Sequence, residues 1–275
     1  MVTNPERPIR KDEIVLDERG IYVESWLPER RSRRRPLLFV HGELAGSWLW
    51  EPFLGYFAHR GWEGHAVNLH GHFWSETSEV LACDLDAYVD DVVAVFERIP
   101  PNPVLVGHGM GGLLAMLAAE ERRVAGIVLV SPALPEQLRT PPRPHVIREI
   151  PDTFDRALVG WQAMPELLRR QNPDLAIEDV LRIQHLMGRE SGTARRSMLQ
   201  GVPVDRERVR QVPSLVIGAG LDRWFPEPGS ERLAAWLEAQ YEPFGAHSHY
   251  GLVAGSESYL QVAETIRSFL ESHRL

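Results

Sequence analysis

The chain has 275 residues, of which 44% are hydrophobic and 25% are charged, and this composition excludes a disordered or fibrous protein. The formal net charge of −8 argues against nucleic acid as a partner, because binding a polyanion requires a positive surface. The length favours one large α/β domain with an insertion.

Short apolar runs alternate with helical patterns in the first half of the chain. Residues 14–16 and 21–26 flank the turn-like residues 18–20 and predict an antiparallel hairpin. Further strands are predicted at 36–40, 65–69, 104–106 and 124–130. Helices are predicted between them at 49–59, 85–96 and 113–118. This order predicts a mostly parallel sheet with helices on both faces.

The alternation stops after Ser131 and Pro132 and resumes near residue 214. Between these points the chain has proline-rich connectors and helical segments, and we predict no strand there. Strands at 214–218 and 241–244 and helices at 231–239 and 256–273 complete the pattern. We therefore predict a core made of residues 1–132 and 211–275, with a helical cap inserted at 133–210.

A glycine-rich turn in the middle of the chain is the most informative motif. The run Gly107-His108-Gly109-Met110-Gly111 follows a predicted buried strand and opens a helix. Glycines suit a sharp strand-to-helix turn, which needs small residues or positive φ. A dinucleotide loop would instead need G-x-G-x-x-G beside the first strand. Such a turn can present a catalytic serine as G-x-S-x-G, but here Gly109 stands in the serine position.

With these motifs the chain resembles the α/β-hydrolase family, in particular capped bacterial esterases, lactonases and carbon–carbon bond hydrolases. Residues 39–50 look like the family's oxyanion loop. Residues 68–75 resemble its R-G-H-G-x-S loop, with His70 in place of the arginine and Phe73 in place of the second glycine. The resemblance implies an α/β-hydrolase fold: a mostly parallel eight-stranded sheet, helices on both faces and an inserted helical cap.

The resemblance also implies a set of catalytic residues. Residues 218–222 resemble the loop that supplies the acid, and residues 249–252 resemble the histidine loop. His249 would act as the base, and Asp222 would fix its tautomer. The backbone amides of Glu43 and Met110 would form the oxyanion hole.

Two of these assignments have alternatives in the sequence. Asp222 could simply cap the turn before Trp224, and His247 could replace His249 as the base. The spacing to Gly251 favours His249.

Aromatic and apolar side chains on the loops and in the insertion predict an apolar pocket, and hence a small apolar or aromatic substrate. Packing beneath a lid would explain the same side chains equally well. The predicted lining residues are His41, Gly42, Trp48, His108, Trp74, Trp161 and Met164.

No metal or other cofactor is predicted. His70 and His72 suggest a metal only weakly, because a binuclear H-x-H-x-D-H site would need other residues where Trp74 and Ser75 stand. The single cysteine, Cys83, cannot form an internal disulfide, fits a reducing compartment, and is expected to be a packing residue.

The expected location is the cytoplasm, without a membrane partner. Residues 1–8 carry no apolar signal region, and no window reaches the roughly eighteen apolar residues that a membrane span needs. The basic run at 30–35 is interpreted as a solvated turn. A homodimer is left open.

Gly109 leaves three interpretations of function. The chain is an inactivated serine hydrolase, or a His249/Asp222 general-base enzyme with hydrolase, lyase, cyclase or isomerase chemistry, or a non-catalytic binder. A binder has no physical need for an oxyanion loop, an acid and a histidine together. The set therefore favours an enzyme of the hydrolase family, acting on an ester, lactone or ketone-type substrate.

Overall fold

The computed structural model describes residues 8–16, 18–30, 33–75, 83–140 and 142–275. Eight strands form one sheet in the order β1-β2-β4-β3-β5-β6-β9-β10. The strands are β1 (Ile9–Leu16), β2 (Ile21–Pro28), β3 (Leu37–Val40), β4 (Gly64–Asn68), β5 (Val104–His108), β6 (Gly126–Val130), β9 (Ser214–Ala219) and β10 (Gln240–Phe244). The β1–β2 and β2–β4 pairs are antiparallel and the other pairs are parallel, which confirms the predicted sheet.

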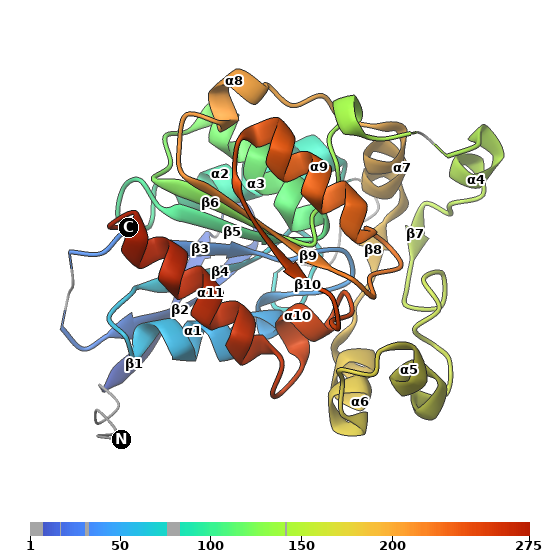
Figure 1. The fold of residues 1–275 in the computed structure, drawn as a ribbon, viewed down its shortest axis with the longest axis horizontal. Coiled ribbons are helices and arrows are strands. Elements are labelled where there is room, and N and C mark those ends of the chain that lie inside the picture. Colours follow the sequence, from blue (N-terminus) through green and yellow to red (C-terminus); the bar gives the residue numbers. More distant parts are fainter. Residues whose placement is uncertain (1–7, 17, 31–32, 76–82, 141) are drawn as a thin grey trace.

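Helices cover both faces of this sheet (Figure 1). One face carries α1 (Glu51–Ala58), α10 (Gly251–Ala254) and α11 (Tyr259–Ser272). The other carries α2 (Leu85–Val95), α3 (Met110–Glu121), α8 (Arg206–Val209) and α9 (Glu227–Leu237). No pattern in the sequence predicts the one-turn helix α10, and α9 begins four residues earlier than predicted.

Alternate side chains of the central strands enter two separate cores. Leu37 and Phe39 of β3 pack in the core beneath α1 and α11, whereas Leu38 and Val40 pack in the core beneath α2, α3 and α9. A parallel strand that is buried on both faces reads as a continuous apolar run. For this reason the sequence locates the central strands well.

Most of the segment between β6 and β9 projects from one side of the sheet, and its last helix, α8, returns to the face that carries α3 (Figure 1). It contains α4 (Pro144–Arg148), β7 (Thr153–Phe154), α5 (Pro165–Gln171), α6 (Ile177–Leu186), β8 (Glu190–Ser191), α7 (Gly192–Gln200) and α8. β7 and β8 pair with each other, so the prediction of no strand in 133–210 is wrong. Strands of two residues are too short to show an alternating pattern. The boundaries of a cap at 133–210 stay a prediction.

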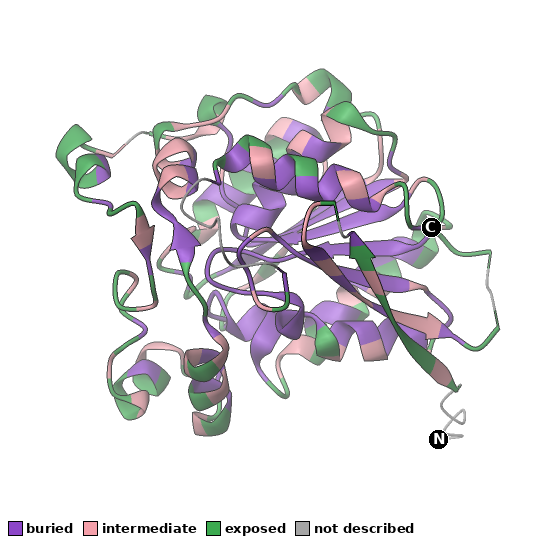
Figure 2. Ribbon diagram, turned by 180° about the vertical axis from the view of Figure 1, so that it is seen from behind, coloured by how far each residue is buried: buried purple, intermediate pink, exposed green. Residues whose placement is uncertain are grey.

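This inserted segment has many exposed residues, whereas the central strands of the sheet are buried (Figure 2). Helices α5 and α6 bury only some of their apolar residues. Leu168 and Ile183 are buried, but Leu167 and Leu181 are exposed.

Two sequence features fall partly outside the described residues: the N-terminal stretch before Pro8, and Arg31 within the basic run. In the described ranges no helix is long and apolar enough to cross a membrane.

Gly111 allows α3 to start directly against the end of β3. A Cβ atom on Gly111 would lie 2.3 Å from the Val40 carbonyl oxygen and 2.5 Å from that of His41. Both neighbours are backbone atoms, which cannot move away cheaply. The absence of a side chain therefore sets how closely the first turn of α3 approaches the loop after β3.

Replacing Gly111 should destabilise the fold. We predict that Gly111→Ala lowers the free energy of unfolding by about 1–3 kcal/mol, because the methyl group overpacks this junction. Urea denaturation measures the change. The control is Gly188→Ala, whose Cβ would meet no atom within 4 Å, and which should stay within about 0.5 kcal/mol of the wild type. Equal effects of the two variants would contradict the prediction.

Candidate active site

Gly109 is the single residue between β5 and α3. Its φ of 56° and ψ of −121° would strain any residue that has a Cβ atom. A Cβ built on Gly109 would lie 3.3 Å from His249 Nε2 and 3.5 Å from Phe225 Cε2. The side-chain position that glycine leaves open is therefore directed at the His249 ring.

His249 is held by Asp222. The distance from His249 Nδ1 to Asp222 Oδ2 is 2.6 Å, and both side chains are buried. An ionised carboxylate only accepts hydrogen bonds, so Nδ1 carries the proton in the neutral ring. Nε2 is then left with a free lone pair that faces Gly109. Within the described chain His249 makes a hydrogen bond to Asp222 and His247 does not.

Asp222 has a hydrogen-bond partner on each oxygen. Oδ1 accepts from the amides of Trp224, at 2.7 Å, and Phe225, at 2.9 Å, while the Ser131 hydroxyl donates to Oδ2. Burial alone would raise the pKa of this carboxyl, but the His249 charge and these hydrogen bonds outweigh burial and lower it. Asp222 thus caps its own turn and also orients His249. No sequence motif pointed to Ser131.

Aromatic rings surround His249. Its ring centroid lies 4.1 Å from that of His108, 4.9 Å from that of Trp224 and 5.2 Å from that of Tyr250. His108 Nε2 donates to the His249 carbonyl oxygen at 3.1 Å. Burial, with the nearby His249 charge, holds the pKa of His108 well below its usual value. His108 therefore stays neutral, and it supports His249 through ring packing and through its hydrogen bond to the His249 carbonyl.

Two backbone amides remain available for an oxyanion. In the chain as described, neither the Glu43 nor the Met110 amide donates a hydrogen bond to another protein group. Met110 begins α3, and the first amides of a helix have no partner within it. Buried amides are nearly always paired, so these two are good candidates to bind a ligand oxygen.

The loop that carries Glu43 is held by residues 188–195 of the inserted segment. Gly188 N donates to Leu44 O at 2.9 Å, and Leu44 N donates to Glu190 Oε2 at 3.0 Å. Leu44 has a left-handed φ of 64°, which a residue with a Cβ adopts only when its surroundings impose it. Arg195 Nη1 lies 2.8 Å from both oxygens of the Glu43 carboxylate.

Glu190 also forms a fully buried ion pair with His72. Glu190 Oε2 is 3.0 Å from His72 Nε2, and Tyr88 OH donates to Oε1 at 2.8 Å. Burial alone would lower the pKa of His72 and raise that of Glu190, but their mutual attraction outweighs burial and shifts each pKa the opposite way. No sequence pattern pointed to Glu190, because its partners lie more than a hundred residues away.

Only some of the predicted lining residues lie at the pocket beside His249. Trp161 lines a pocket of about 130 Å³ together with Trp224, His249 and Tyr250. Trp74 and Met164 are 67% and 70% exposed and do not line this pocket.

The other predicted lining residues are buried beneath the site: His41, Gly42, Trp48 and His108. Burial lowers the pKa of His41 to about 3, and its neutral ring ties the loop after β3 to the amide of Leu69, 3.1 Å from Nε2. These four residues are not among those that line the pocket beside His249.

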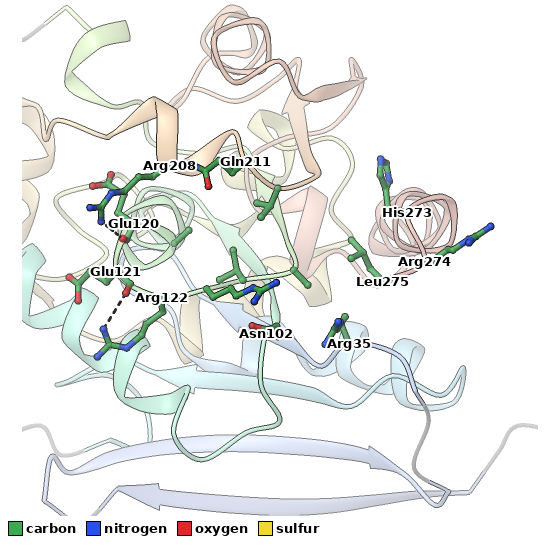
Figure 3. A pocket seen from close by; sticks show the side chains of 15 residues that line it. Arg35, Asn102, Glu120, Glu121, Arg122, Arg208, Gln211, His273, Arg274 and Leu275 are labelled. Atoms are coloured by element: carbon green, nitrogen blue, oxygen red, sulfur yellow. Dashed lines mark hydrogen bonds between the residues drawn. The ribbon is translucent and has the colours of Figure 1, made fainter.

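A wider groove of about 850 Å³ lies at the opposite edge of the sheet, where the parallel strands begin (Figure 3). Arg35, Asn102 and Arg208 are among the residues that line it. It is remote from His249, because His249 lies beside Gly109 at the carboxyl ends of the strands. Ligands of open parallel sheets usually bind at that end.

Neither the histidine pair nor the cysteine forms a separate centre. Within the described ranges, no group of three or more histidine, cysteine or acidic side chains is arranged to hold a metal ion. His72 is taken by Glu190, and Cys83 is buried.

Comparison with known proteins identifies the family. The sequence model described as "Alpha/beta hydrolase family" matches residues 37–265. The chain belongs to the alpha/beta hydrolase family. This confirms the relationship expected from the glycine-rich turn and the loops around it.

Individual relatives are distant. The AB hydrolase superfamily protein YisY of Bacillus subtilis is 25% identical over 78% of this chain and 85% of its own length. The human monoglyceride lipase is 40% identical, but over only 26% of each chain. Among solved structures, an esterase from Thermogutta terrifontis aligns with 97% of this chain and 100% of its own, with a TM-score of 0.70 and 19% identity.

The buried His72–Glu190 pair should make stability depend on pH in both directions. The raised pKa of His72 adds stability that is complete below its ordinary value of 6.5 and is lost as the pH rises through the raised value. The lowered pKa of Glu190 adds stability that is present above 4.5 and is lost as the pH falls through the lowered value. We predict that this contribution is greatest between pH 4.5 and 6.5, as measured by chemical denaturation across pH.

The matched variant is Glu190→Gln, which keeps the shape and removes the charge. It should lower the free energy of unfolding by about 3–5 kcal/mol near pH 6, because it leaves a buried charge unpaired. As the pH rises, the stability of this variant should fall less steeply than that of the wild type. An unchanged alkaline slope would show that the pair does not cause it.

Proposed function

We propose that the chain is an enzyme in which His249 and Asp222 act as a general base on a water molecule bound beside Gly109. The substrate is a small apolar or aromatic ester, lactone or ketone-type compound. One observation carries the proposal: the position of a Cβ on Gly109 is 3.3 Å from His249 Nε2, the ring atom that Asp222 leaves unprotonated. A water oxygen in this space would lie within hydrogen-bonding range of the base.

The reaction with an ester proceeds in two steps. His249 Nε2 takes a proton from the water as the water oxygen bonds to the acyl carbon, and the carbonyl electron pair moves to its oxygen. The amides of Glu43 and Met110 bind this oxyanion. When the pair returns, the bond to the alkoxide breaks, and the alkoxide takes the proton from Nε2. The products are an acid and an alcohol, and no acyl-enzyme forms.

Asp222 supports the charged intermediate state. Its lowered pKa keeps it ionised, so that it stabilises the imidazolium while Nε2 holds the proton. The water takes the role that a serine hydroxyl has when it attacks the acyl carbon, and it needs no side chain at position 109.

The substrate class rests on the surroundings of His249. Trp161, Trp224 and Tyr250 line the adjoining pocket, and apolar walls favour an apolar or aromatic group. The names esterase and lipase among the relatives support an ester as the bond that is cleaved. We also propose that the partner of this protein is a small molecule and that the protein acts in the cytoplasm.

Two variants at position 109 and one at 249 test the proposal. With 4-nitrophenyl acetate and 4-nitrophenyl phenylacetate, we expect slow turnover by the wild type that falls about 10²–10⁴-fold in His249→Ala, the usual contribution of a positioned base. Gly109→Ala should lower turnover at least tenfold, because its methyl group occupies the space of the water. Steady-state kinetics on folded variants measures both changes.

Gly109→Ser separates the competing interpretations. It adds the hydroxyl but also backbone strain of about 1–3 kcal/mol. If the chain is an inactivated serine hydrolase, serine raises turnover by several orders of magnitude with a burst of product. If His249→Ala or Gly109→Ala cleaves the esters as fast as the wild type does, general-base catalysis is overturned. Ligand retention without any turnover would identify a binder.

A further inference from the structure

A second pocket, of about 310 Å³, adjoins the His249 site. Trp224 lines both pockets, and Phe225, which lines this one, also borders the space beside Gly109. The pocket lies between the segment that follows β6, the start of α9 and Leu199 of α7. Its volume is within the range of small-molecule sites.

Most of its wall is apolar. Leu134, Leu199, Trp224 and Phe225 contribute hydrocarbon and aromatic surface. Such a wall accepts the body of an apolar molecule, and the few polar groups then decide which ligand fits.

Two polar atoms at this pocket are buried without a hydrogen-bond partner among the described residues. They are Arg139 Nε and Ser230 Oγ, and Ser230 is only 1% exposed. Arg139 uses one other nitrogen, Nη1, to donate to Met198 O at 2.7 Å. Buried polar atoms are normally paired, so these two lining side chains have donor capacity that no described residue uses.

The charge of Arg139 is not neutralised by an ion pair within the described chain. Glu43 is close enough to stabilise the charged form of Arg139, but Arg195 binds its carboxylate at 2.8 Å. Burial lowers the pKa of Arg139, yet a guanidinium remains charged at any physiological pH. Arg232 adds a second positive charge to the lining.

The start of α9 adds to this positive field. Gly229 and Ser230 line the pocket in the first turn of this eleven-residue helix, whose N-terminus favours negative charge. Glu227 of the same turn accepts a hydrogen bond from Tyr241 and does not line the pocket.

We propose that this pocket binds the carboxylate of a small apolar molecule, with Arg139 and Ser230 as its hydrogen-bond donors. A carboxylate accepts hydrogen bonds from both groups and neutralises the guanidinium. Resting on the proposed function, we assign the substrate as an ester or lactone that carries a free carboxylate, held here while its acyl group reaches His249.

Binding measured without turnover tests the pocket itself. Isothermal titration calorimetry compares 4-phenylbutyrate with its neutral isostere, 4-phenylbutyramide. We expect the wild type to bind the carboxylate at least tenfold more tightly, and Arg139→Met to lose that preference. The control is Arg143→Met, an exposed arginine outside the lining, which should keep it. Equal binding of the two compounds, or no binding of either, would overturn the proposal.

Ser230→Ala provides a second variant if Arg139→Met does not fold. It removes only the orphan hydroxyl and should reduce the preference for the carboxylate severalfold. An unchanged preference in a folded Ser230→Ala protein would remove Ser230 from the site, and an unchanged preference in Arg139→Met would overturn the pocket.

Kinetics connects the pocket to catalysis. We expect kcat/KM for the mono-4-nitrophenyl ester of glutaric acid to exceed that for 4-nitrophenyl pentanoate at least tenfold, and Arg139→Met to remove the difference through KM. Carboxylate binding without His249-dependent turnover would keep the pocket and refute the proposed function. Turnover without preference for the acidic ester would refute the substrate assignment.

Discussion

The hydrogen bond between His249 Nδ1 and Asp222 Oδ2 determines what the site can do. It fixes the tautomer of the ring, and thereby leaves Nε2 unprotonated and directed at the open space beside Gly109. Asp222 can remain ionised although it is buried, because Ser131 and the amides of Trp224 and Phe225 bind its oxygens. Gly109 places no side chain in the space that His249 Nε2 faces.

The site also depends on the inserted segment. Residues 188–195 bind both backbone groups of Leu44 and the carboxylate of Glu43, so the loop with the Glu43 amide is built partly by this segment. In the same segment, Met198 O accepts a hydrogen bond from Arg139, and Leu199 lines the second pocket. The loop that carries the Glu43 amide and one wall of the second pocket therefore both depend on this segment.

The sequence predicts the sheet and the turn at Gly109 because those signals are local. Continuous apolar runs mark strands buried on both faces, and glycines mark the turn. Ser131 and Glu190 escape prediction because their partners, Asp222 and His72, are 91 and 118 residues away. The exposure of Trp74 and Met164 is not predicted either, because apolar character alone does not distinguish a pocket wall from an exposed surface.

Intact-protein mass spectrometry, on samples quenched during turnover of an aromatic ester, tests the central claim most directly. Direct attack by a water that His249 activates predicts a wild-type chain of unchanged mass throughout turnover. An acyl adduct on the wild-type chain, lost in step with turnover, would show that another side chain is the nucleophile and would contradict general-base hydrolysis at Gly109.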